Sequence, residues 1–135
     1  MAQAPNGIRS ATREDLLTAM RAEAFAYASY MLFAARARED GRTEVAELFE
    51  TVAQTDLHRH FARLAQEAAL VGGDAENLRS AIEESSYAIE IMYPSFAEHA
   101  AAAGDTGAAD AFTQARADDL ANLESFREAL LETDG

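Results

Sequence analysis

The feature that most constrains this sequence is that its second half repeats its first half. The early part of the repeat has an offset of 62 residues, in the pairs Glu14 and Glu76, Leu16 and Leu78, and Ala19 and Ala81. The later part has an offset of 63, which relates Tyr30, Phe33, Ala34, Ala37, Gly41, Thr43, Ala46, Phe49, Asp56 and Leu57 to Tyr93, Phe96, Ala97, Ala100, Gly104, Thr106, Ala109, Phe112, Asp119 and Leu120. One structural unit is therefore used twice. The second copy has one surplus residue between Ile82 and Tyr93, where we expect a π-bulge or a similar widening of a helix.

The repeated unit is predicted to be a hairpin of two long helices. Apolar residues recur at alternating steps of three and four in stretches rich in Ala, Leu, Glu and Arg. These stretches predict helices over roughly 12–40, 43–71, 75–103 and 106–132. Glycines, which commonly end helices, follow or separate them at Gly41, Gly72, Gly73 and Gly104. We expect a single all-α domain over residues 1–135, with a flexible tail over residues 1–11.

The connection between the two hairpins limits the topology. A helix of about 28 residues is about 42 Å long, whereas the link from Gly72 to Asp74 spans on the order of 10 Å when extended. The link therefore cannot run the length of a bundle. Either four helices run up-down-up-down within one chain, or each hairpin packs against a hairpin of a second molecule in a domain-swapped dimer.

Each apolar stripe is interrupted by a polar residue at one level. Glu23 lies 18 residues before Gly41 and Asp56 lies 15 residues after it, so both are expected near mid-height of the first hairpin. Ser85 and Asp119 hold similar places in the second hairpin. Carboxylates that converge in a bundle core are typical of carboxylate-bridged di-iron sites.

Composition narrows the chemistry. The sequence has no cysteine, which excludes thiolate catalysis and iron–sulfur sites and leaves oxygen and imidazole as metal ligands. The absence of cysteine also favours a cytoplasmic location. The net charge of −13 disfavours nucleic acid and anionic membranes as partners. No apolar run is long enough to cross a bilayer.

Several segments together resemble a known family over about residues 12–130. The matching segments are Ala22-Glu23 with Tyr30, Leu48-Phe49-Glu50 with Asp56 and Arg63-Leu64, Glu76-Asn77-Leu78, Ile91-Met92-Tyr93-Pro94-Ser95-Phe96-Ala97, and Ala109 to Phe112 with Asp119. In these residues the chain resembles the rubrerythrin branch of the ferritin-like superfamily. The resemblance implies a ferritin-like four-helix bundle, a homodimer with swapped hairpins, and a di-iron centre that reduces hydrogen peroxide. It also implies an external electron donor, because most relatives carry a Cys-rich rubredoxin module.

Carried over position by position, the resemblance assigns metal ligands to Glu23, Asp56 and Asp119. Other ligand positions of the family are changed. Its helix-two His falls on Arg59, its two helix-three Glu ligands fall on Ser85 and Ala88, and its helix-four His level falls on Asn122. The implied di-iron site is therefore degenerate.

Two function classes follow from this altered site. In the first, a pair of iron ions bound by the three acids, with His60 as a replacement ligand, reacts with peroxide or dioxygen. In the second, the guanidinium of Arg59, with Asn122 at the same level, compensates the acids in a metal-free ionic core, and the protein is a binding or scaffolding module. A solvated acid cluster, with Arg59 extended to the surface, is the remaining interpretation.

Overall fold

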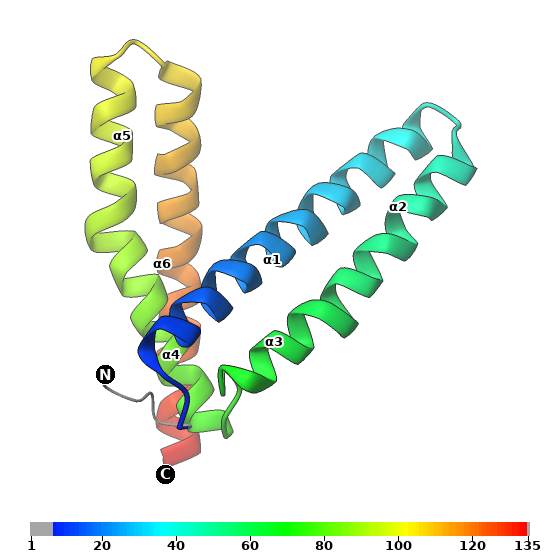
Figure 1. Ribbon diagram of the computed structural model, residues 1–135. Coiled ribbons are helices and arrows are strands. Elements are labelled where there is room, and N and C mark those ends of the chain that lie inside the picture. Colours follow the sequence, from blue (N-terminus) through cyan, green and yellow to red (C-terminus); the bar gives the residue numbers. More distant parts are fainter. Residues whose placement is uncertain (1–6, 135) are drawn as a thin grey trace. The chain divides into compact units, whose positions relative to one another are not determined.

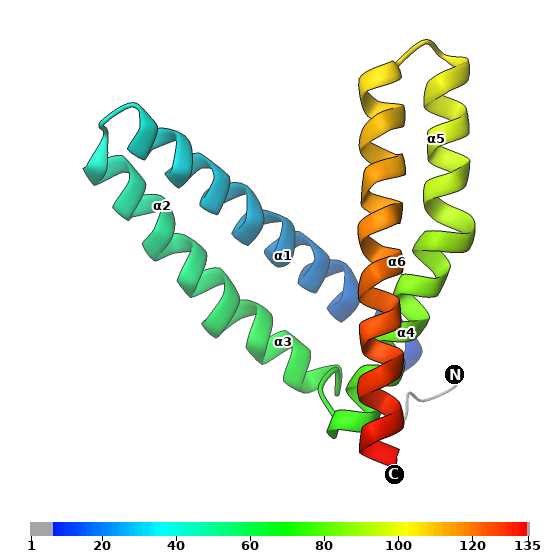
Figure 2. The same cartoon turned by 180° about the vertical axis from the view of Figure 1, so that it is seen from behind.

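The computed structural model describes residues 7–134, and every regular element in this part of the chain is a helix. The chain forms two compact units, one ending at Val71 and the other beginning at Gly72. Each unit is an antiparallel helical hairpin, visible in both views of Figures 1 and 2. The all-helical fold and the repeated hairpin agree with the sequence-based prediction. No helix among the described residues is long and apolar enough to cross a membrane.

The first hairpin consists of α1 (Ser10–Glu39) and a second helical path built from α2 (Thr43–Thr55), η1 (Asp56–Phe61) and α3 (Ala62–Glu67). The middle segment η1 is a π-helix, which the sequence did not predict. Helix α1 begins two residues before the expected start, so residues 10 and 11 are helical instead of part of a tail. The predicted tail over 1–6 lies outside the described residues.

The second hairpin consists of α4 (Asp74–Tyr87), η2 (Ala88–Met92), α5 (Tyr93–Ala102) and α6 (Thr106–Asp134). The segment η2 is a π-helix and lies inside the interval that holds the surplus residue of the repeat. The predicted widening is therefore confirmed. The first three segments form one continuous path, which α6 accompanies along its length.

The π-turn in η2 is coupled to Pro94. The N–H of Tyr93 donates to the carbonyl of Ala88, five residues earlier, as in a π-helix. The next donor in this register would be Pro94, which has no N–H. The carbonyl of Ile89 instead accepts a hydrogen bond from Nε of Arg116 on α6, at 2.9 Å. A side chain from the facing helix thus satisfies the carbonyl that the π-turn and the proline leave free.

Three helix ends share one backbone motif, in which a residue with positive φ follows the helix. The residue is glycine at two of them, Gly41 (φ 72°) and Gly104 (φ 84°), but it is Ala69 (φ 53°) at the end of α3. In each motif the following N–H donates to a carbonyl five residues earlier, at 2.7 Å from Arg42 to Ala37, 3.0 Å from Leu70 to Ala65 and 2.9 Å from Asp105 to Ala100. An alanine in this conformation is strained.

The repeat is visible in the packing of the aromatic residues. In the first hairpin, the ring centroids of Phe33 and Phe49 lie 5.4 Å apart, and those of Tyr30 and Phe49 lie 5.8 Å apart. In the second hairpin, the equivalent rings of Phe96 and Phe112 lie 5.5 Å apart. Each hairpin therefore closes on the same arrangement of rings near its turn.

Neither hairpin covers its own apolar stripe. Phe33, Val52 and Phe96 lie on the predicted inward stripes, yet they remain 50%, 39% and 43% exposed. Among the described residues, no large side chain is fully buried. The buried residues of the first hairpin are mostly alanines, which let its helices approach closely. A second layer of helices is needed to bury the remaining apolar surface.

Candidate metal site

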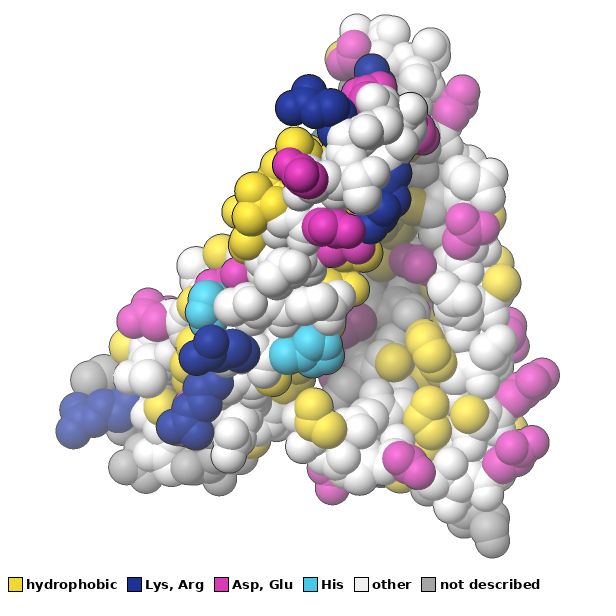
Figure 3. Space-filling model, turned by 90° about the vertical axis from the view of Figure 1, so that its right-hand side faces the viewer, with side chains coloured by type: hydrophobic (Ala, Val, Ile, Leu, Met, Phe, Trp, Pro, Cys, Tyr) yellow, Lys and Arg dark blue, Asp and Glu magenta, His cyan; other side chains and the backbone are white. Residues whose placement is uncertain are grey.

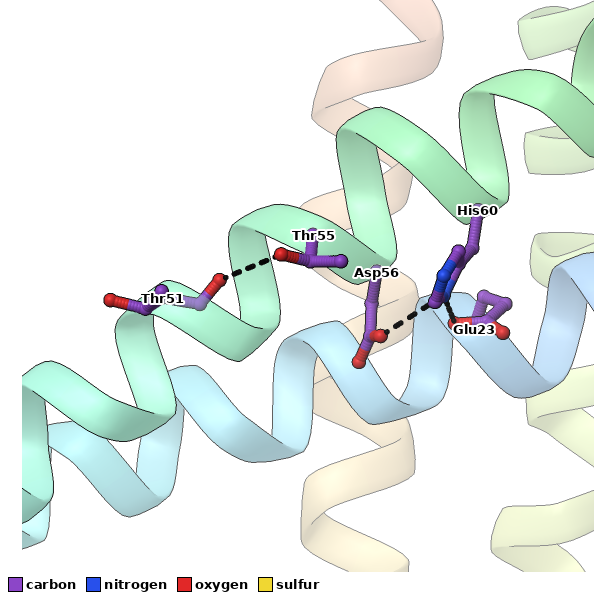
Figure 4. A network of polar contacts seen from close by, with 5 residues as sticks. All are labelled: Glu23, Thr51, Thr55, Asp56 and His60. Atoms are coloured by element: carbon purple, nitrogen blue, oxygen red, sulfur yellow. Dashed lines mark hydrogen bonds and ion pairs between the residues drawn. The ribbon is translucent and has the colours of Figure 1, made fainter.

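A cluster of three polar side chains lies at mid-height of the first hairpin. Glu23 extends from α1, while Asp56 and His60 extend from η1 on the facing helix (Figure 4). Nδ1 of His60 lies 3.4 Å from Oδ1 of Asp56 and 3.5 Å from Oε2 of Glu23. One ligand atom from each residue can be chosen so that all three lie within 4.8 Å of one another.

The π-helix explains why His60 reaches this cluster. In an α-helix of about 3.6 residues per turn, residues three and four positions after Asp56 lie on either side of its direction. A π-turn contains more residues. The residue four positions after Asp56 therefore points in nearly the same direction as Asp56, whereas the residue three positions after it does not. The fourth residue is His60 and the third is Arg59. The π-turn therefore directs His60 toward Glu23 and leaves Arg59 beside the cluster, without an ion pair to either acid in the described part of the chain.

The cluster lies between two apolar clusters of the same hairpin. One is centred on Met20, Ala65 and Ala68 toward the link, and the other on Ala34, Ala37 and Ala46 toward the turn. These contacts fix the two helices on both sides of the polar residues. The apolar clusters position Glu23 opposite η1.

Asp56 is the one buried charged residue in the described part of the chain, at 8% exposure. Burying a carboxylate is costly unless a cation or a hydrogen-bond donor compensates it. Within residues 7–134, the carboxylates of Asp56 and Glu23 have no hydrogen-bond or ion-pair partner except His60. Two converging carboxylates thus share a single imidazole, which is a reason to expect a further cation at this place.

The donor set fits one divalent metal ion. Two carboxylate oxygens and one imidazole nitrogen are ligands that suit iron, manganese or zinc. Two ligand atoms on a tetrahedral ion, each about 2.1 Å from the metal, lie about 3.4 Å apart. The distances from His60 to both acids match this spacing. The described residues of this hairpin thus bring three ligand atoms together at one place.

The predicted contact of Arg59 with the acids of the first hairpin is not found. Arg59 is exposed, and no ion pair joins it to Glu23 or Asp56 among the described residues. The position facing those carboxylates is taken by His60, which the sequence had suggested only as a replacement ligand. The proposed partnership of Arg59 with Asp119 and Asn122 of the second hairpin stays a prediction.

The second hairpin carries a different set at the corresponding positions. Ser85 and Asp119 are half-buried, and the counterpart of His60 at the offset of 63 is Leu123, which is 3% exposed. Asn122 is exposed and Ala88 is buried within η2. In the described part of this hairpin, no three ligand-bearing residues converge. The acids Glu83, Glu84 and Glu90 on this path are exposed.

Comparison with known proteins gives a consistent assignment. The rubrerythrin family model matches residues 14–130. The chain is 29% identical over 136 aligned positions to nigerythrin of Nitratidesulfovibrio vulgaris, covering 91% of the chain and 67% of that protein. It is 33% identical over 117 positions to rubrerythrin of Porphyromonas gingivalis, covering 78% of the chain and 58% of that protein. The chain thus spans about two thirds or less of these relatives. The repeated helical hairpins and the match over most of the sequence show that the chain belongs to the rubrerythrin family.

Proposed function

We propose that this chain is a metal-dependent oxidoreductase in which a single metal ion takes the place of the family's di-iron pair. Glu23, Asp56 and His60 hold the ion. The observation that supports the proposal is the convergence of these three side chains at distances that suit one ion. Bound iron would supply the electron exchange with peroxide or dioxygen that the family membership implies.

The residues of the cluster have separate roles. The two carboxylates balance the charge of a divalent ion, and burial of Asp56 holds its carboxylate in one orientation. The side chain of His60 is 52% exposed, so a small oxidant can approach from that side. The sequence has no cysteine to hold a rubredoxin-type iron centre, so the proposal includes an electron donor outside these 135 residues. We place this chemistry in the cytoplasm.

The same proposal includes a homodimer with exchanged hairpins. The apolar stripes are half-covered within each hairpin, and the link over residues 68–73 is short. A second hairpin would bury the exposed rings and bring Asp119 to the level of the metal cluster. Sedimentation at micromolar concentration should give the mass of a dimer. Inserting about 20 flexible residues between Gly72 and Gly73 should yield a monomer, and a monomeric mass for the unaltered chain would contradict the exchange.

Histidine variants provide the direct test of function. Protein loaded with ferrous iron should consume hydrogen peroxide when a reductant is present, and His60→Leu should lower this activity by about 100-fold, in line with the loss of a metal ligand. His58→Leu is the matched control, because His58 is an exposed neighbour on η1 that lies outside the cluster. Equal activities of the two variants would contradict the proposal. Protein that binds no metal would favour the alternative of a metal-free binding or scaffolding module.

A further inference from the structure

An open pocket of about 460 Å³ lies beside the metal cluster on the first hairpin. Ala19 and Leu64 form its apolar part, and its polar lining consists of Glu23, Arg59, His60 and Arg63. A volume in the range of roughly 300 to 1,000 Å³ is typical of small-molecule sites. Two arginines and two members of the metal cluster thus line one open depression of the surface.

Arg59, the cation that the sequence placed among the acids, lines this pocket. Among residues 7–134, no hydrogen bond or ion pair is found for Arg59. Arg63, one helical turn further on, contacts Glu67 at 3.0 Å and Gln66 at 3.4 Å. These partners are exposed and lie on the same helix, so their contacts stabilise little and can be exchanged for a ligand.

Most arginines of the chain lie in its first half. Residues 1–71 contain eight arginines and ten acids, whereas residues 72–135 contain three arginines and fourteen acids. Figure 3 shows histidine and arginine side chains close together on the face of the first hairpin. In a strongly acidic protein, this pocket is lined by two arginines, Arg59 and Arg63.

We propose that Arg59 and Arg63 bind a small oxyanion, a carboxylate or a phosphate, next to the metal. Guanidinium groups bind both kinds of oxyanion through paired charge-assisted hydrogen bonds. The inference rests on the proposed metal site, because Glu23 and Asp56 oppose an anion until a divalent ion neutralises them. The oxyanion therefore binds better to the metal-loaded protein, and the metal binds better when the oxyanion is present.

Zinc-loaded protein tests this without relying on catalysis. Acetate and methyl phosphate are titrated separately by calorimetry, so that the two titrations distinguish carboxylate from phosphate. The Nε–Hε signals of labelled arginines are followed by NMR in each titration. We expect binding by at least one of them, with the signal of Arg59 shifting. Arg59→Gln and Arg63→Gln should each raise the dissociation constant about tenfold. The control Arg36→Gln, which removes an exposed arginine paired with Asp40, should leave it unchanged.

Each outcome separates the two proposals. Protein that does not bind zinc refutes the metal site. Zinc binding without any response to either anion refutes the oxyanion site alone, and so does an equal loss of affinity in Arg36→Gln. If Arg59→Gln and Arg63→Gln instead weaken the dimer while neither anion binds, the pocket is occupied by carboxylates of a second copy, and the oxyanion proposal is overturned.

Discussion

The two hairpins have the same aromatic packing but different polar residues at mid-height. Phe49 and Phe112 make equivalent ring contacts, whereas the position of His60 in the first hairpin is taken by buried Leu123 in the second. The π-turns differ as well. One lies in the second helical path of the first hairpin, and the other lies in the first path of the second hairpin.

This difference shows how one repeated unit can carry two roles. In the first hairpin, the π-turn directs an imidazole toward two carboxylates and creates a ligand set. In the second hairpin, the π-turn accommodates Pro94, and Arg116 satisfies the free carbonyl of Ile89. The aromatic contacts keep the scaffold the same, while the location of the π-turn decides which side chains converge.

Exchanging the residues at the equivalent positions should give the largest effect on stability. Leu123→His buries an imidazole in an apolar site and removes a buried leucine, which should lower the free energy of unfolding by about 3 kcal/mol. His60→Leu should cost about 1 kcal/mol or less, because half of that side chain is exposed. Urea denaturation of both metal-free variants measures the difference. Equal losses would show that the two positions have similar environments.

The link between Arg116 and Pro94 should give an intermediate effect. Arg116→Ala leaves the carbonyl of Ile89 without its donor, which should cost about 1 to 2 kcal/mol. Pro94→Ala restores a backbone N–H, so the same arginine substitution should cost less in that background. A double-mutant cycle by thermal or urea unfolding gives this coupling. Strictly additive losses would contradict the account of the second π-turn.

The helix end at Ala69 should give the smallest effect. Glycine adopts positive φ without steric cost, so Ala69→Gly should raise the free energy of unfolding by about 0.5 to 1 kcal/mol. Gly41→Ala and Gly104→Ala should lower it, because they introduce the same strain at the other two motifs. Thermal unfolding of the three variants compares these ends directly. A loss of stability in Ala69→Gly would mean that the alanine side chain contributes contacts that outweigh its strain.

Much of the fold follows from the sequence because its signals are periodic. Apolar spacing and the repeated glycines define both hairpins, and the change of offset from 62 to 63 locates η2 between Ile82 and Tyr93. The π-helix η1 leaves no such signal. Leu57, Phe61 and Leu64 follow one another at steps of four and three, as in an ordinary α-helix.

The site was harder to predict for the same reason. The family resemblance identified the positions of Glu23 and Asp56, which the structure brings together. The helical spacing of the sequence placed Arg59 beside them, because α-helical geometry puts the third residue after Asp56 near the same face. The π-turn changes this relation and puts His60 there. Only the spacing of histidine four residues after the acid hinted at the replacement ligand.

The number of metal ions bound by each chain tests the central claim most directly. Protein purified from iron-supplemented cells, or reconstituted with ferrous iron without oxygen and then desalted, is analysed by elemental analysis against protein concentration. The account predicts one ion per chain, retention of that ion in His58→Leu, and its loss in His60→Leu. Two ions per chain, no ion, or an ion that survives His60→Leu would contradict a single-metal site built from Glu23, Asp56 and His60.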